Sequence, residues 1–430
     1  MPVSQAAPWK STPKKRPWLL PVLMLSGATL GFLVGGFGGP YWTQPGVAVA
    51  AAFVDLLGDL FIRLLKMVMV PIVVTSMILG IAAFGDVRKI GRTFGATLAY
   101  YISTTLISVS LGIVLVLIIR PGIGADTAAD AVRTLPHSMP WYEALFDVFR
   151  DMVPANLFAA AAEGRVLGLI VASLIFGGLL TTLGSRGAKI IELVEIINEA
   201  IFKFVRIVIW LAPIGIFGLV AAKIGEAGGG AVVGHELAKL LRYALTVISG
   251  LMIHAVIILP LLLVFFARRN PLRQAGQFSE ALLTAFTTAS SAASLPITLR
   301  DARQNAGLSE RTSGFVLPLG ATINMDGTAL YEAVAVIFIC QAYGIDLSIP
   351  QIIVIWLTAT LAAIGAAAIP EAGLVTMVMV LSAVGAPEEG IYIILSIDWF
   401  LDRCRTTVNV WGDTVGTAII DRHFAPPPEA

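Results

Sequence analysis

Five polar or charged residues recur at helical spacing in the last long apolar stretch of the chain, ILSIDWFLDRCRTTVNVWGDTVGTAII. They are Asp398, Asp402, Arg405, Asn409 and Asp413. At about 100° per residue they point to roughly 0°, 40°, 340°, 20° and 60° around a helix axis, so they form one stripe. Four ionised side chains facing lipid would together cost about 10 kcal/mol. The sequence therefore predicts that the stripe faces a hydrated or protein-lined cavity.

The charges of this stripe suit an amino acid that carries a second carboxylate. Three acids against one arginine leave an excess of negative charge, which favours bound cations or protons; internal ion pairs that only hold the helices together are the alternative. The guanidinium of Arg405 can bind a carboxylate through two hydrogen bonds. Asp402, one turn earlier on the same face, can accept hydrogen bonds from an ammonium. Thr406 and Asn409 are placed to add neutral hydrogen bonds.

A second polar group, NMDGT at 324–328, interrupts an apolar segment that is long enough to span a membrane. Asn324 and Asp326 offer hard oxygens, and Gly327 is expected to let the helix unwind and expose carbonyls that suit sodium. The alternative is a glycine kink with a satisfied asparagine. Glu332 is a lone acid two turns later. Buried carboxyl groups can hold a proton near neutral pH, so Glu332 is either a proton carrier or a hydrogen-bonded core residue.

A serine-rich tip divides the segment 279–305 into two half-length apolar pieces. The tip contains Ser290, Ser291, Ser294 and Pro296. Backbone N–H groups at the start of a half-helix could bind a carboxylate here, and a serine nucleophile is the competing interpretation. The four histidines are His137, His235, His254 and His423. Three of them fall in loops or at the tail, and His254 stands alone in GLMIHAVIIL, where we expect a packed or interfacial residue, so a catalytic triad is unsupported and no enzyme is expected.

Composition places these residues in a membrane protein. The 430 residues are 57% hydrophobic and 13% charged, with a mean hydropathy of +0.86, whereas soluble domains carry about 25% charged residues. A net charge of +1 gives no reason to expect nucleic acid. Cys340 and Cys404 lie in apolar segments, so neither a disulfide framework nor a cysteine metal site is indicated. No cofactor is expected apart from transported ions.

Six apolar segments are long enough to cross a bilayer, for which roughly 20 residues suffice. They lie near 18–36, 50–84, 93–119, 166–185, 190–222 and 238–267. Four basic residues, Lys10, Lys14, Lys15 and Arg16, put the N-terminal tail (1–17) in the cytoplasm. We interpret the first apolar run as an uncleaved span, because more spans follow it.

The region 271–423 has a different design, in which polar and small residues interrupt every apolar stretch. The segments 279–305 and 352–385 are each too short to cross twice, so we expect two re-entrant hairpins that enter from opposite faces. Such an inverted repeat is how secondary transporters build a site near the midplane. The predicted fold is an all-α membrane protein of eight transmembrane helices plus two re-entrant hairpins, with a C-terminal tail at 424–430.

Four motifs, in order along the chain, resemble one family. They are TTASSAASLP, NMDGTALYEA, IGAAAIPEAGLVTMV and DWFLDRCRTTVNVWGD. The chain is similar to the sodium-dependent dicarboxylate and amino acid symporters that include the glutamate transporters. This resemblance implies a homotrimer in the cell membrane. In it, a scaffold of spans 1, 2, 4 and 5 would hold a transport domain, made of spans 3 and 6 and residues 271–423, that moves as an elevator.

The resemblance also implies ligand sets. Substrate contacts would be Ser290, Ser291, Thr328, Ile369, Gly373, Asp402, Arg405, Thr406 and Asn409. Sodium ligands would be Tyr101, Thr104, Thr105, Gly320, Asn324, Asp326, Asn409 and Asp413. The residues alone had given no reason to single out Tyr101, Thr104 and Thr105, which look like ordinary helix residues.

Within the family, this chain resembles the animal excitatory amino acid transporters. Ala289 stands where archaeal members carry an arginine, and Arg403 supplies that charge from the last helix. Glu332 matches the proton-carrying glutamate of the animal proteins. The resemblance thus implies uptake of glutamate or aspartate with sodium, proton cotransport and potassium countertransport, with Glu332 and Arg403 in the coupling.

Other functions stay open at this stage. A C4-dicarboxylate transporter usually has asparagine in place of Asp413, and the neutral amino acid branch lacks Arg405. An intramembrane serine hydrolase and a channel are alternatives from other classes. Four departures from the family pattern, Ala292, Ala293, Ala368 and Glu371, lie at the two hairpin tips.

Overall fold

The computed structural model describes residues 19–42, 44, 46–82, 92–123, 146, 150, 152–163, 166–226, 228–365 and 372–424. Every regular element in these ranges is a helix, as the composition predicts. The first half contains α1 (Leu19–Gly38), η1 (Gly39–Tyr41), α2 (Ala48–Ala82), α3 (Arg92–Ile119), α5 (Leu157–Ala162), α6 (Val166–Thr182), α7 (Ser185–Glu226) and α8 (Gly230–Ile253). The six predicted apolar spans coincide with α1, α2, α3, α6, α7 and the helix that begins with α8.

The helix that begins with α8 continues through two π-helical turns to residue 267. They are η4 (His254–Ile258) and η5 (Leu263–Ala267), which flank α9 (Leu259–Leu262). Within the described ranges, five helices are long and apolar enough to cross a membrane, and three shorter apolar helices accompany them. The five are Ala48–Ala82, Arg92–Ile119, Ser185–Glu226, Val233–Ala267 and Glu310–Ala342. The count of eight crossings stays a prediction.

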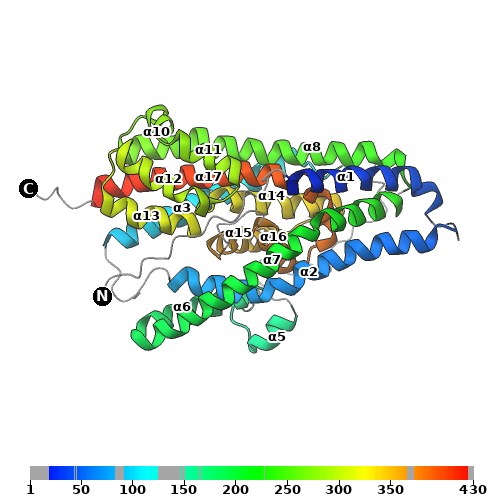
Figure 1. Ribbon diagram of the computed structural model, residues 1–430, viewed down its shortest axis with the longest axis horizontal. Coiled ribbons are helices and arrows are strands. Elements are labelled where there is room, and N and C mark those ends of the chain that lie inside the picture. Colours follow the sequence, from blue (N-terminus) through cyan, green and yellow to red (C-terminus); the bar gives the residue numbers. More distant parts are fainter. Residues whose placement is uncertain are drawn as a thin grey trace, which may run out of the picture.

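Helices α1, α2, α6 and α7 pack on one another. The contacts of α7 with α2 and α1 are the most extensive in the described chain, and Figure 1 shows α2, α6 and α7 together along one side. Glycine lets α2 and α7 approach closely, since a Cβ added to Gly218 would lie 2.6 Å from the backbone nitrogen of Gly58. Lys66 of α2 reaches across to Glu388 at 2.7 Å, near the start of the last helix.

The second half contains the predicted hairpins and the polar helix. Its elements are α10 (Pro271–Gln277), α11 (Ser279–Thr288), α12 (Ser291–Gln304), α13 (Glu310–Ile323), α14 (Asp326–Ala342), α15 (Ile349–Gly365), α16 (Ala372–Ala383), η6 (Glu388–Gly390) and α17 (Ile391–Phe424). Helices α11 and α12 form one hairpin, and α15 and α16 form the other. The first hairpin turns at Ala289, whose φ of 49° is left-handed, and Ser290 then caps α12. The tip of the second hairpin, including Ala368, Ile369 and Glu371, lies outside the described residues.

The predicted interruption at NMDGT is present, but the predicted position of the break is wrong. Helix α13 ends before Asn324 (φ −96°, ψ 78°), and Met325 (φ −111°, ψ 57°) is the second non-helical residue. Gly327 lies inside the first turn of α14 and does not unwind it. Its lack of a side chain serves a close approach instead, because an added Cβ would lie 2.8 Å from the backbone oxygen of Arg405.

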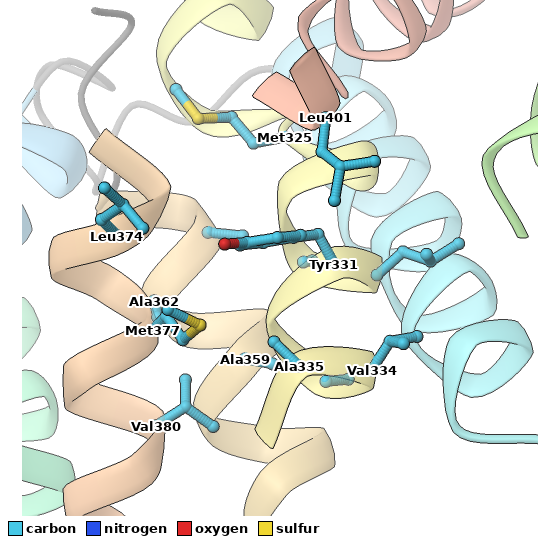
Figure 2. Packing of buried hydrophobic residues seen from close by; sticks show 14 of the residues in the cluster. Met325, Tyr331, Val334, Ala335, Ala359, Ala362, Leu374, Met377, Val380 and Leu401 are labelled. Carbon is cyan, nitrogen blue, oxygen red and sulfur yellow. The ribbon is translucent and has the colours of Figure 1, made fainter. Parts of the chain in front are cut away.

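Helix α14 forms the centre of the core. From Asp326 to Cys340, every residue is buried, and the helix packs on α3, α15, α16 and α17. Figure 2 shows Tyr331, Val334 and Ala335 of α14 with Leu374 and Met377 of the second hairpin around them. Apolar side chains thus surround α14, and the break between α13 and α14 lies at its buried N-terminal end.

Candidate functional site

The five stripe residues of α17 point into the protein. Their exposed fractions are 0% for Asp398, 7% for Asp402, 0% for Arg405, 3% for Asn409 and 2% for Asp413. The inward direction agrees with the insertion cost that these side chains would otherwise incur. The stripe is packed against the rest of the chain, so its partners decide what it can bind.

Arg405 faces two carboxylates and the face of one aromatic ring. Its Nη2 donates to Oδ1 of Asp402 at 2.9 Å, and its Nη1 lies 3.3 Å from Oδ1 of Asp398. Its Cζ lies 3.7 Å from the ring centroid of Tyr331, which makes a cation–π contact. Among the described residues, neither Nη1 nor Nε of Arg405 has a hydrogen-bond acceptor. The guanidinium therefore keeps donors that a carboxylate ligand can use.

Other predicted substrate contacts gather near this arginine. The start of α16 approaches closely, because a Cβ added to Gly373 would lie 2.9 Å from Nη1 of Arg405. Asn409 ties α17 to α14: its Oδ1 accepts from the nitrogen of Gly327 at 2.8 Å, and its Nδ2 donates to Oγ1 of Thr328 at 3.2 Å. Thr406 is buried on the same helix. Ile369 lies outside the described residues.

The two tip serines hold their own helix. The Oγ of Ser290 accepts from the nitrogen of Ala293 at 3.2 Å, and the carbonyl of Ser291 accepts from Ser294 at 3.0 Å. Both serines are buried at the start of α12. No contact in the described structure links them to Arg405, so their role in substrate binding stays a prediction.

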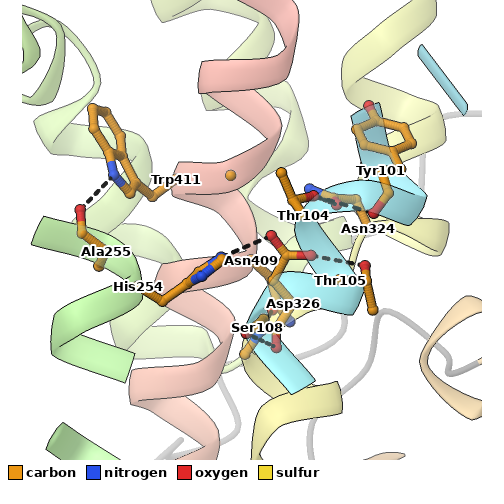
Figure 3. Close-up of polar contacts among 12 residues, drawn as sticks. Tyr101, Thr104, Thr105, Ser108, His254, Ala255, Asn324, Asp326, Asn409 and Trp411 are labelled. Carbon is orange, nitrogen blue, oxygen red and sulfur yellow. Dashed lines mark hydrogen bonds and ion pairs between the residues drawn. The ribbon is translucent and has the colours of Figure 1, made fainter. Parts of the chain in front are cut away.

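Asp326, the first residue of α14, is the centre of a second polar cluster (Figure 3). Its Oδ1 accepts from Oγ1 of Thr105 at 2.8 Å, and its backbone oxygen accepts from Oγ of Ser108 at 2.8 Å. Beside it, Oγ1 of Thr104 lies 3.3 Å from Oδ1 of Asn324. Helix α3 thus presents three hydroxyls to the break between α13 and α14.

The same cluster extends to α17. Nδ2 of Asn324 donates to Oδ1 of Asp413 at 2.9 Å. Gly320 lies against this carboxylate, and a Cβ added to it would collide with Asp413 and lie 2.7 Å from the hydroxyl oxygen of Tyr101. The Tyr101 hydroxyl itself donates to the backbone oxygen of Val316 at 2.7 Å. All eight residues implied as sodium ligands are therefore buried around one break, and their hydroxyl, amide, carboxylate and carbonyl oxygens are hard ligands of the kind small cations prefer.

His254 is packed, as predicted, but the sequence pattern did not reveal its polar partner. Its Nε2 lies 3.0 Å from Oδ2 of Asp326, and both side chains are fully buried. The apolar run GLMIHAVIIL concealed this contact, because a sequence pattern shows which residues flank a histidine and not which helix it faces. Ser108 was missed for the same reason, although its place one turn after Thr104 and Thr105 was a usable signal.

The two predicted coupling residues face different neighbours. The Oγ1 of Thr376, on α16, donates to Oε1 of Glu332, which is fully buried in α14. Nη1 of Arg403 donates to the backbone oxygens of Phe286 at 3.1 Å and Thr287 at 2.6 Å, at the end of α11. Each residue thus connects a different hairpin to the core, and no described contact joins the two.

Comparisons with known proteins identify the kind of protein that carries this arrangement. The model of the Sodium:dicarboxylate symporter family matches residues 20–423. Excitatory amino acid transporter 1 of Ambystoma tigrinum is 41% identical over 416 residues, covering 85% of this chain and 76% of that protein. Excitatory amino acid transporter 3 of Mus musculus is 41% identical over 414 residues, covering 85% and 78%. The putative sodium-dependent excitatory amino acid transporter glt-4 of Caenorhabditis elegans is 39% identical over 411 residues, covering 85% and 82%.

The match extends over nearly the whole chain, the relatives are transporters and not enzymes, and the apolar helices make this a multi-pass membrane protein. On these grounds the chain belongs to the sodium:dicarboxylate symporter family.

Proposed function

We propose that this protein is a secondary active symporter that takes up L-glutamate or L-aspartate, driven by sodium. The observation that carries this proposal is Arg405, a fully buried guanidinium that faces two carboxylates of its own helix and the ring of Tyr331 and, among the described residues, keeps donors without an acceptor. The names of the relatives support an excitatory amino acid as the substrate.

Substrate binding would rearrange the ion pairs of α17. The side-chain carboxylate of the amino acid takes the donors of Arg405, because a bidentate charged pair is the strongest one available there. Asp402, now released from Arg405, accepts from the substrate ammonium. Thr406, Asn409 and Thr328 add neutral hydrogen bonds, while Ser290, Ser291, Ile369 and Gly373 close the site from the two hairpin tips.

Sodium would occupy the oxygen clusters at the break. One set of ligands is Tyr101, Thr104, Thr105, Asn324 and Asp326, and another is Gly320, Asn409 and Asp413. Asn409 also touches Gly327 and Thr328, so a cation that orders it also orders a substrate contact. Glu332 would carry a proton and, with Arg403, take part in potassium countertransport.

The packing of the helices suggests which part of the protein would move during transport and which part would stay fixed. We propose that α1, α2, α6 and α7 form a trimerisation scaffold in the cell membrane. The transport domain would then be α3, the helix that begins with α8, and residues 271–423, and it would move as an elevator. The ion pair between Lys66 and Glu388 crosses this boundary. The N-terminal tail would lie in the cytoplasm.

A C4-dicarboxylate is the second candidate substrate, since the family name covers dicarboxylates. Proteoliposomes with an inward sodium gradient separate the two. We expect labelled L-aspartate uptake that depends on the gradient and is inhibited by L-glutamate far more than by succinate, because succinate has no ammonium for Asp402. Equal inhibition by succinate would favour the dicarboxylate, and uptake without sodium would reject the symporter.

Replacing the arginine tests the substrate assignment. In Arg405→Ala, uptake of L-aspartate should fall roughly 30-fold or more, because truncating one partner of a buried charge pair costs about 2–5 kcal/mol. Uptake of L-aspartate and of a neutral amino acid is measured in Arg405→Ala and in the unmodified chain. A rise of the unfolding temperature with sodium in the variant shows that it is folded. Unchanged aspartate uptake in a variant that folds would sink the assignment.

A glycine tests the sodium assignment. In Gly320→Ala, the new methyl group displaces Asp413 and Tyr101, so the sodium concentration for half-maximal uptake should rise about 10-fold or more. Gly314→Ala is the matched control in the same helix, because its Cβ would lie 3.6 Å from its nearest neighbour, Nη2 of Arg303. The same sodium dependence in both variants would contradict a cation site at Gly320.

A glutamate tests ion coupling. Glu332→Gln keeps the shape of the side chain but cannot exchange a proton, so uptake should no longer respond to pH or potassium gradients that are set independently. Thr376→Val removes the hydrogen-bond donor but leaves the carboxyl group, and it should retain both responses. An unaltered response of Glu332→Gln to both gradients would reject the role.

A further inference from the structure

His254 is a fully buried polar residue that the proposed function does not use. It lies at the end of α8, and the neighbouring side chains along the helix are apolar. Its Nε2 lies 3.0 Å from Oδ2 of Asp326, while its Nδ1 has no hydrogen-bond partner among the described residues. The imidazole is therefore held in place by one hydrogen bond, and that bond points at the candidate sodium ligand.

The backbone around His254 is irregular for an identifiable reason. Pro260 has no N–H, and its ring clashes with the carbonyl four residues earlier in an α-helix. The helix adopts a π turn here: the nitrogen of Leu259 donates to the oxygen of His254, five residues back. Ala255, whose π-type partner would be the nitrogen of Pro260, is left with a free carbonyl. That carbonyl accepts from Nε1 of Trp411 on α17 at 3.0 Å.

The π turn therefore supports the site at two adjacent points. His254 faces Asp326 at the start of α14, and Ala255 faces Trp411 on α17, two residues after Asn409 (Figure 3). The π turn η4 is thus bonded to α14 and α17, two of the helices that supply candidate ligands. π turns of this kind occur frequently at functional sites.

The hydrogen bond fixes the orientation of the Asp326 carboxylate. A carboxylate only accepts, so Nε2 of His254 carries the hydrogen. Oδ1 is held by Thr105 at 2.8 Å and Oδ2 by His254 at 3.0 Å, so the carboxylate is fixed between α3 and η4. With its hydrogen directed at Asp326, Nε2 cannot itself ligate a cation. Through Nε2, His254 therefore affects a cation only by way of Asp326.

We propose that His254 is a positioning residue of the sodium site: its Nε2–H holds Asp326 in the orientation that binds the cation. This inference rests on the proposed function, which assigns Asp326 as a sodium ligand. Partners that orient a metal-ligating carboxylate typically contribute a factor of about 10 to 100 in affinity. His254 thus sets how much sodium the transporter needs, without touching either sodium or substrate.

The test compares three substitutions of His254. Gln places an amide nitrogen the same number of bonds from Cβ as Nε2, Asn is the same amide one methylene shorter, and Leu fills the space without a donor. We expect His254→Leu and His254→Asn to raise the sodium concentration for half-maximal uptake by about 10- to 100-fold. In His254→Gln, the sodium concentration for half-maximal uptake should stay within about threefold of that of the unmodified chain. His423→Leu, at an exposed histidine on the tail of α17, is the control and should change nothing.

Two further readouts separate positioning from packing. Aspartate affinity at saturating sodium should be nearly unchanged in all three variants, and the preference for sodium over lithium should fall in His254→Leu and His254→Asn only. The rise of the unfolding temperature with sodium, measured without substrate, reports binding even in a variant that transports poorly.

Each outcome decides the proposal. Equal sodium dependence in His254→Leu and the unmodified chain overturns it. It is also overturned if His254→Gln raises the sodium concentration for half-maximal uptake as much as His254→Leu does, because that result would indicate that the packing of the imidazole matters and not its N–H donor. If His254→Leu does not fold, His254→Asn, whose amide is one methylene too short for Asp326, supplies the same comparison with His254→Gln. Absence of any sodium effect on the unmodified chain would instead reject the proposed function.

Discussion

Burial of ionised side chains away from water is the constraint on which this structure depends. Asp398 and Asp402 both face Arg405 inside α17, and Asp326 meets His254 and a threonine hydroxyl at the start of α14. Removing one partner of such a pair costs about 3–5 kcal/mol, because the other charge is left unpaired in a poor solvent. The partners come from α3, η4, α14 and α17, so the packing of these elements on one another avoids that cost. The same packing creates the candidate site.

The break between α13 and α14 has a related logic. A helix that stops inside the protein exposes backbone groups that must find partners. The nitrogen of Gly327, in the first turn of α14, finds its partner in Asn409, and Ser108 adds a hydrogen bond to the oxygen of Asp326, so α17 and α3 both support the break. A continuous helix would bury no free backbone carbonyls, so only side chains could serve as ligands there. The break is therefore costly on its own and stable only where these polar side chains surround it.

The sequence predicted the helices, the two hairpins and the inward face of α17, because a period of 3.6 residues and the cost of charge in lipid are local properties. It misplaced the break by assigning the unwinding to Gly327. A glycine in a sequence can mark either a kink in the backbone or a close approach to a neighbouring helix, and here it marks a close approach. It predicted a packed His254 but missed its partner Asp326, because a contact between residues 72 positions apart is set by tertiary packing. The substrate-contact role of the tip serines and the number of membrane crossings stay predictions, which neither periodicity nor the contacts of a single chain decide.

The two polar clusters are not independent. Asn409 contacts Gly327 and Thr328, the latter a proposed substrate contact, and one turn later Asp413 contacts Asn324 in the oxygen cluster. A ligand that orders either cluster reduces the freedom that the other must lose, and coupling of this kind is reciprocal: whatever factor sodium adds to substrate affinity, substrate adds to sodium affinity. Because the connection runs through one turn of α17 and the break between α13 and α14, it needs no long pathway through the protein. Coupled transport is then expected from placing the two candidate sites on that turn and that break.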